Sequence, residues 1–213
     1  MNKFTFTAVL AAVSSFATSA LAHHPLGGET PTTLMHGLLS GIGHPVIGVD
    51  HLAFVIAVGI AAALAGSRYL VPLAFVLATI AGTIWHVMAF NLPAVELVIA
   101  LSVALGGVIV FTGRRVPVAA LAALFSIAGL FHGFAYGEAI FGAEATPMLA
   151  YLAGFGLTQY AIAVVAGTLV VSVMGKSAEW SANVPARIVG GMVAGAGGLL
   201  LSEHALAALS LAG

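Results

Sequence analysis

One stretch of eight residues carries most of the chemically reactive side chains in an otherwise apolar segment. It runs His44-Pro45-Val46-Ile47-Gly48-Val49-Asp50-His51 and combines two imidazoles, a carboxylate, a proline and a glycine. Ionisable side chains are costly at membrane depth and are usually retained there for function. The residue types and their close spacing predict a divalent-metal site.

Four further residues are candidate ligands. His132 and Glu138 lie in and just after a later apolar run, and we expect a function for them, with bridging between helices as the alternative. His23 would offer both an amine and an imidazole if the chain is cleaved before it; a plain flexible arm is equally compatible. His36, at the edge of the first apolar run, fits a ligand or a solvated interfacial histidine equally well.

The donor set narrows the metal but does not identify it. The chain has eight histidines and no cysteine. Imidazole suits Ni²⁺, Co²⁺, Zn²⁺, Cu²⁺ and Fe²⁺, whereas the lack of thiolate argues against Cu⁺ and iron–sulfur clusters. Abundant histidine also argues against Mg²⁺ and Ca²⁺. The residue types indicate a divalent transition metal.

The composition defines the class of protein that positions these residues. Of 213 residues, 61% are hydrophobic and 6% are charged, and the net charge is −1. A soluble domain carries roughly 25% charged residues. The chain is therefore predicted to be an all-α integral membrane protein in a lipid bilayer, and no nucleic-acid partner is implied.

Three regions follow one another along the chain. Residues 1–22 have a lysine, an apolar stretch and an Ala-Leu-Ala end, which is typical of a cleaved signal peptide. Residues 23–33 are polar and rich in proline and glycine, and are predicted to form a periplasmic arm that carries His23. Residues 34–213 are predicted to form a six-helix transmembrane domain.

Six apolar runs are each long enough to cross the hydrocarbon core, which takes about 20 residues. The predicted spans are 35–65, 70–90, 93–111, 116–136, 147–174 and 186–211. We expect the first span to be broken near Pro45 and Gly48, with a helix starting at about Pro45, because proline suits the first turn. On a straight helix His44 and His51 would lie about 10 Å apart along the axis, so they could share an ion only if the backbone breaks.

Two further patterns concern packing and orientation. Glycines recur four residues apart at Gly37/Gly41, Gly129/Gly133, Gly133/Gly137 and Gly191/Gly195, which predicts close helix contacts. Aromatic residues near the span ends predict membrane interfaces, namely Trp85, Tyr136, Tyr151 and Trp180.

The basic residues of the mature chain all fall in alternate loops: Arg68, Arg114, Arg115, Lys176 and Arg187. The opposite loops carry Glu138 and Glu144. The positive-inside rule then places the protein in a bacterial cytoplasmic membrane with both mature termini in the periplasm. Every ionisable residue within the spans falls in the outer half, which suggests capture of a ligand from outside.

Two motifs resemble those of a known family. His-Pro-x-x-Gly-x-Asp-His at 44–51, followed directly by an apolar run, resembles the signature of the HupE/UreJ proteins. Phe-His-Gly-Phe-Ala-Tyr-Gly-Glu at 131–138 resembles that family's second motif, Phe-His-Gly-x-Ala-His-Gly-x-Glu. The six-span layout and a signal ending before a histidine also agree, so the resemblance covers essentially the whole mature chain.

The resemblance implies secondary uptake of Ni²⁺, or of Co²⁺ in some members, serving hydrogenase or urease maturation, and no enzymatic activity. It implies that the metal path includes His44, Asp50, His51, His132 and Glu138. Two departures matter: Tyr136 replaces the second histidine of the second motif, and the fifth span offers only Gln159 where members often carry histidine. The phenol is a poorer ligand for Ni²⁺.

A different class of function fits the same residue types. A His/Asp/His cluster at one leaflet can hold Zn²⁺ with an open water position, as in an intramembrane hydrolase. Glu138 could serve as its general base, although no nucleophile motif accompanies it. Saturable metal uptake would favour the permease, and a tightly bound metal that never exchanges would favour the enzyme.

Overall fold

The computed structural model describes residues 29–174 and 184–211, without the side chains of 49, 50, 174 and 208–211. The predicted signal peptide and most of the arm, including His23, lie outside the described residues. Within them every regular element is a helix. In chain order these are α2 (Leu34–Ile47), α3 (Val49–Leu64), α4 (Leu70–Val87), α5 (Val95–Thr112), α6 (Val118–Tyr136), the short 3₁₀ helix η2 (Gly137–Ile140), α7 (Ala145–Met174) and α8 (Val184–Leu211).

The helices α4 to α8 are each long and apolar enough to cross a membrane, and the bent pair α2–α3 can supply a sixth span. The prediction of an all-α membrane protein is confirmed. Local signals define some helix ends: the Thr33 side chain accepts the backbone N–H of His36 at the start of α2, and Gly113 ends α5 with a φ of 66°.

The first span is broken, as predicted, but not where proline was expected to start a helix. Pro45 lies inside the last turn of α2, and the break falls at Gly48, whose backbone is extended with φ −74° and ψ 99°. The two helical segments on either side, 34–47 and 51–64, meet at 76°. The α2 helix tolerates Pro45 because that turn is packed against other helices.

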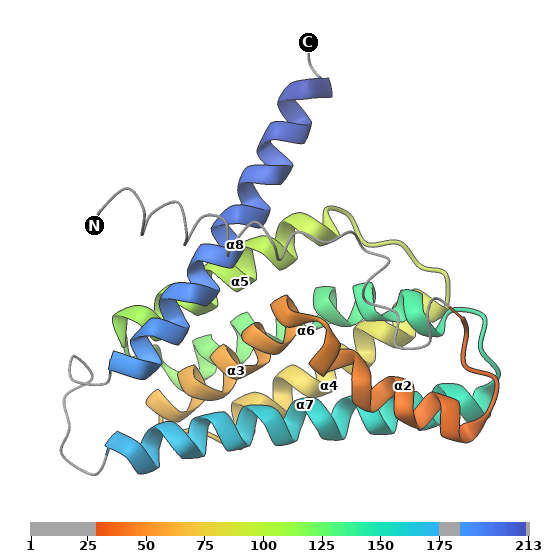
Figure 1. Ribbon diagram of the computed structural model, residues 1–213, viewed down its shortest axis with the longest axis horizontal. Helices are drawn as coiled ribbons and strands as arrows, with labels where there is room; N and C mark the ends of the chain where they lie inside the picture. The colour runs from red at the N-terminus through yellow and green to blue at the C-terminus, as the bar shows by residue number, and fades with distance from the viewer. Residues whose placement is uncertain (1–28, 175–183, 212–213) are drawn as a thin grey trace, which may run out of the picture.

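Glycines set the closest helix contacts in the bundle, in which α2 and α3 pack on α7, α4 packs on α6 and α5 packs on α8 (Figure 1). A Cβ at Gly41 would meet the Tyr151 carbonyl, and one at Gly133 would meet the Thr79 carbonyl. The glycine pairs predicted on α2 and α6 therefore do lie at close contacts between helices. Gly195 is not, because a Cβ there meets nothing within 4 Å.

The two ends of the bundle differ in charge. The turn after α3 carries Arg68, and the loop between α5 and α6 carries Arg114 and Arg115. The opposite end carries Glu138 and Glu144 between α6 and α7. Large apolar side chains such as Leu157 and Val173 are exposed on the sides of the helices, where a bilayer would cover them.

Candidate metal site

Three histidines from three helices gather inside the bundle. His44 comes from the last turn of α2, His51 from the first turn of α3 and His132 from the last turns of α6. His44 is 5% exposed, His132 is 1% exposed and His51 is half-buried. The bend at Gly48 makes this possible, because it turns α3 away from the direction of α2 and shortens the distance between His44 and His51.

Two of the three imidazoles contact the ring of Tyr136, and His51 also contacts His132. The His44 and His51 ring centres lie 4.8 and 4.5 Å from the Tyr136 ring centre. His51 lies 6.4 Å from His44 and 5.7 Å from His132, centre to centre. Two imidazoles that share one ion at about 2.1 Å have ring centres roughly 5 to 6 Å apart. The His51–His132 pair is in that range and the His44–His51 pair is slightly beyond it.

The arrangement is not a closed metal cage. Within the described residues, no three His, Asp or Glu side chains form a group arranged to hold a metal ion. Tyr136 lies against His44 and His51, at the position where the family's second motif has a histidine. A phenol there is a poorer ligand for a late divalent ion than a fourth imidazole would be.

His132 is held by contacts on two sides. Its ring stacks on Phe54 of α3, with 4.3 Å between the centres and 7° between the planes. Its Nε2 atom lies 2.9 Å from the Ser102 hydroxyl of α5, and that hydroxyl donates to the Ile99 carbonyl at 2.7 Å. The Nδ1 atom of His132 is buried and has no hydrogen-bond partner among the described residues.

His44 is held by Tyr151 of α7. The Tyr151 hydroxyl lies 2.8 Å from Nδ1 of His44 and donates to the Tyr136 carbonyl at 3.3 Å. Tyr136 and Tyr151 are 1% and 0% exposed. The prediction that these two tyrosines mark membrane interfaces is therefore wrong, because the close approach of α2 to α7 at Gly41 covers Tyr151. Trp85 is exposed, and Trp180 lies outside the described residues.

The other residues expected in the metal path differ in position. Asp50 belongs to the first turn of α3, next to His51, but its side chain lies outside the described part of the structure. His36 is exposed in the first turn of α2, two turns before His44. The structure therefore brings His44, His51 and His132 together and leaves His36 apart from them.

Glu138 lies outside the buried cluster. Its side chain is 73% exposed in η2, and its Oε2 atom lies 3.5 Å from Nε2 of His86 on α4. Counted along the quoted motif, the family's glutamate falls on Ala139, which is buried, so Glu138 is one position early. Glu138 and His86 form an outer His–Glu pair instead.

A second set of polar side chains joins α4, α6 and α7 through hydrogen bonds. Thr83 donates to the Gly133 carbonyl at 2.9 Å, one residue after His132. Gln159 is fully buried and donates through Nε2 to Thr79 Oγ1 at 3.1 Å. These bonds fix the part of α6 that carries His132.

Sequence reasoning missed the two residues that orient the histidines, Ser102 and Tyr151. A lone serine in an apolar helix is a weak signal, since it usually bonds a carbonyl of its own helix. The sequence also did not predict that His86 pairs with Glu138, although it places both residues at the same end of the bundle.

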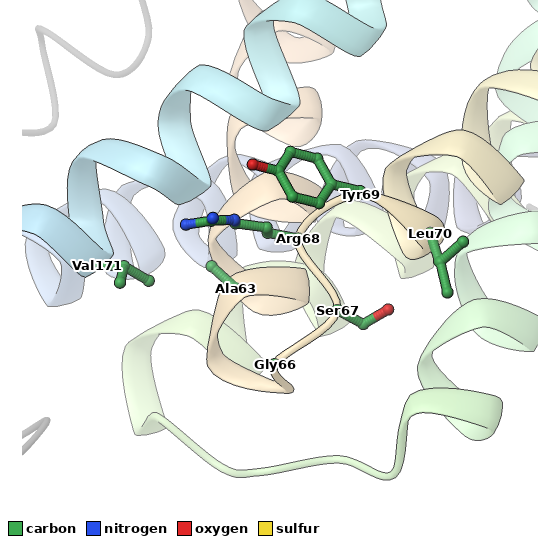
Figure 2. Close-up of a pocket in the computed structure, with 7 residues that line it drawn as sticks. All are labelled: Ala63, Gly66, Ser67, Arg68, Tyr69, Leu70 and Val171. Carbon is green, nitrogen blue, oxygen red and sulfur yellow. The ribbon is translucent and has the colours of Figure 1, made fainter. Parts of the chain in front are cut away.

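The described surface also has a cavity of about 430 Å³ at the opposite end of the bundle. It lies between the turn after α3 and the end of α7, and Arg68 stacks under the Tyr69 ring at 4.8 Å (Figure 2). Its lining contains no His, Asp or Glu. This cavity is therefore separate from the histidine cluster and offers no imidazole or carboxylate ligand.

Comparisons with known proteins agree with the resemblance in the motifs. The family described as HupE / UreJ protein matches residues 10–200. The chain is 32% identical to Protein HupE of Rhizobium leguminosarum bv. viciae over 199 residues, which cover 92% of this chain and 98% of that protein. No solved structure matches the chain. The chain belongs to the HupE/UreJ family, a family of metal transporters and not of enzymes.

Proposed function

We propose that the protein takes up a divalent transition metal, nickel first and cobalt second, across the bacterial cytoplasmic membrane by secondary transport. The observation that carries the proposal is the convergence of His44, His51 and His132 from three helices at a buried position. Buried ionisable groups in a membrane span are expensive and usually mark a substrate path.

The open geometry of the cluster suits a permeation site. Conduction needs binding that is strong enough to admit an ion and weak enough to release it. Imidazole pairs at 5.7 and 6.4 Å can each contact an ion in turn, with water completing its shell. A rigid cage of three or four protein ligands would retain the ion.

The ion enters from the periplasmic end. The arginines at 68, 114 and 115 lie at the opposite end of the bundle, and the positive-inside rule assigns that end to the cytoplasm. The outer His86–Glu138 pair then concentrates cations at the mouth, and the buried histidines receive them. The predicted arm with His23, and Asp50 beside His51, would add donors on the same side.

Membership of a transporter family gives no support to the hydrolase alternative. The choice of nickel rests on the family, with hydrogenase or urease maturation as the consumer of the metal. Tyr136, in place of a family imidazole, predicts weaker nickel binding than a further imidazole at that position would give.

Metal accumulation tests the proposal. Cells that express the wild type at limiting nickel or cobalt should accumulate more of the ion than cells with an empty vector. The His44→Ala and His51→Ala variants, at matched membrane levels, should lose this gain. A well-inserted wild type that accumulates neither ion would contradict the proposal.

A further inference from the structure

The Ser102 hydroxyl has one hydrogen and two close partners. It lies 2.7 Å from the Ile99 carbonyl oxygen, which can only accept, and 2.9 Å from Nε2 of His132, which can donate or accept. Two oxygens at 2.7 Å need a hydrogen between them, so the hydroxyl hydrogen goes to Ile99. Ser102 must then accept from His132.

This assignment of the hydroxyl hydrogen defines the tautomer of the neutral His132 ring. If Nε2 donates to Ser102, then Nε2 carries the proton and Nδ1 carries a lone pair. Nδ1 is buried without a hydrogen-bond partner among the described residues. An unsatisfied buried acceptor is costly, and a cation is one partner that would satisfy it.

We propose that Ser102 is a positioning residue that holds the proton of His132 on Nε2, so that Nδ1 is the atom that binds the permeating metal ion. The inference rests on the proposed function for its metal, although the tautomer itself does not. Ligating histidines commonly donate their other ring N–H to an outer partner, which fixes both tautomer and orientation. Here the partner is a hydroxyl that is itself anchored to the backbone of α5, and the Phe54 stack holds the ring plane.

The tautomer can be read by long-range proton–nitrogen NMR of the purified, metal-free protein in lipid nanodiscs at about pH 8, where an ordinary imidazole is neutral. Histidine is labelled with nitrogen-15, and His132 is assigned by the signals that His132→Gln lacks. We expect the wild type to carry the proton on Nε2 alone. Ser102→Ala should give a mixture of tautomers, whereas Ser102→Thr, which keeps the hydroxyl, should retain Nε2–H.

Thr112→Val is the matched control. Thr112 is also on α5 and donates to the Val108 carbonyl at 2.7 Å, so the variant removes a similar hydroxyl without touching His132. It should leave the His132 spectrum unchanged. A proton on Nδ1 in the wild type would overturn the inference, and this reading needs no variant other than the His132→Gln used for the assignment. An unaltered His132 tautomer in Ser102→Ala would overturn it too.

Nickel uptake supplies the second readout. Ser102→Ala should raise the half-saturating nickel concentration by roughly 10-fold, as loss of an outer partner of a ligand does, with the maximal rate largely kept. Ser102→Thr should restore it. Unchanged half-saturation in Ser102→Ala would overturn the role of Ser102.

The two proposals fail differently. If the wild type carries the proton on Nε2 but transports no metal, the permease account falls, and with it the role of Nδ1 as a ligand. If the wild type transports nickel with the proton on Nδ1, only the inference about Ser102 falls.

Discussion

The buried histidine cluster and the outer His–Glu pair use similar side chains in opposite surroundings. In the cluster, His132 is 1% exposed and is oriented by Phe54 and Ser102. In the outer pair, Glu138 is 73% exposed, and its carboxylate oxygen lies 3.5 Å from Nε2 of His86. The cluster is buried among three helices, whereas in the outer pair His86 packs on Phe134 and Phe141 and the Glu138 carboxylate is exposed.

In the proposed metal path, the two regions have different tasks. An exposed carboxylate interacts in high dielectric and contributes little to affinity, although it can raise the local concentration of cations. A buried imidazole with a fixed tautomer offers one lone pair in a set direction, so its loss cannot be compensated by water. Variants in the two regions should therefore differ both in the size of their effect and in the kinetic parameter affected.

The largest effect is expected at the cluster. His132→Gln and His51→Ala should reduce nickel uptake to the level of empty cells, because each removes a ring nitrogen of the proposed metal path. Uptake of radioactive nickel, normalised to membrane-inserted protein, measures this. Substantial uptake by either variant would remove the cluster from the path.

A smaller effect is expected from moving the cluster without changing its side chains. In Gly41→Ala the new Cβ meets the Tyr151 carbonyl and lies 2.9 Å from the Phe155 nitrogen, so α2 must move away from α7. Overpacking of this kind costs about 1–3 kcal/mol. We expect a lower thermal midpoint in detergent and a several-fold loss of uptake.

Gly195→Ala is the control for that variant, because it adds the same methyl group to a helix where nothing lies within 4 Å. Its thermal midpoint and uptake should match the wild type. Equal losses in both variants would show that close packing of α2 on α7 does not position His44.

Substitutions in the outer pair should affect only the capture of the metal ion from outside. Glu138→Gln and His86→Gln should each raise the half-saturating nickel concentration several-fold and leave the maximal rate intact, because both residues lie outside the buried cluster. The rise should shrink as ionic strength increases, since salt screens exposed charges. A lost maximal rate in Glu138→Gln would place that carboxylate in the path itself.

The smallest effect is expected at His36. It is exposed, and its backbone N–H is bonded to Thr33 at the start of α2, so a side-chain change to Gln keeps the helix start. His36→Gln should leave uptake within the error of the wild type. A loss comparable with that of His51→Ala would extend the metal path to the beginning of α2.

The helices were predictable because the bilayer sets their length and because apolar runs of that length are easy to find. The break of the first span was also visible, in the form of Gly48 between the two histidines. The position of Pro45 was not, because the tertiary contacts of α2 decide whether the helix continues through a proline.

The site was predictable in its residue types but not in its geometry. His44, His51 and His132 stand out as imidazoles in apolar surroundings, yet their convergence depends on which faces of α2, α3 and α6 meet. Ser102 and Tyr151 have no such signal, because their roles arise from the rotation of α5 and α7 about their axes. Tyr151 also resembles an interfacial aromatic in sequence, and only the packing at Gly41 shows that it is buried.

Transport by the purified protein tests the central claim most directly. Proteoliposomes that contain the wild type, His132→Gln or His36→Gln would be given radioactive nickel outside and a strong chelator inside. The account predicts saturable entry for the wild type and His36→Gln, and entry no faster than in empty liposomes for His132→Gln. Equal rates for the wild type and His132→Gln would contradict a metal path through the buried histidines.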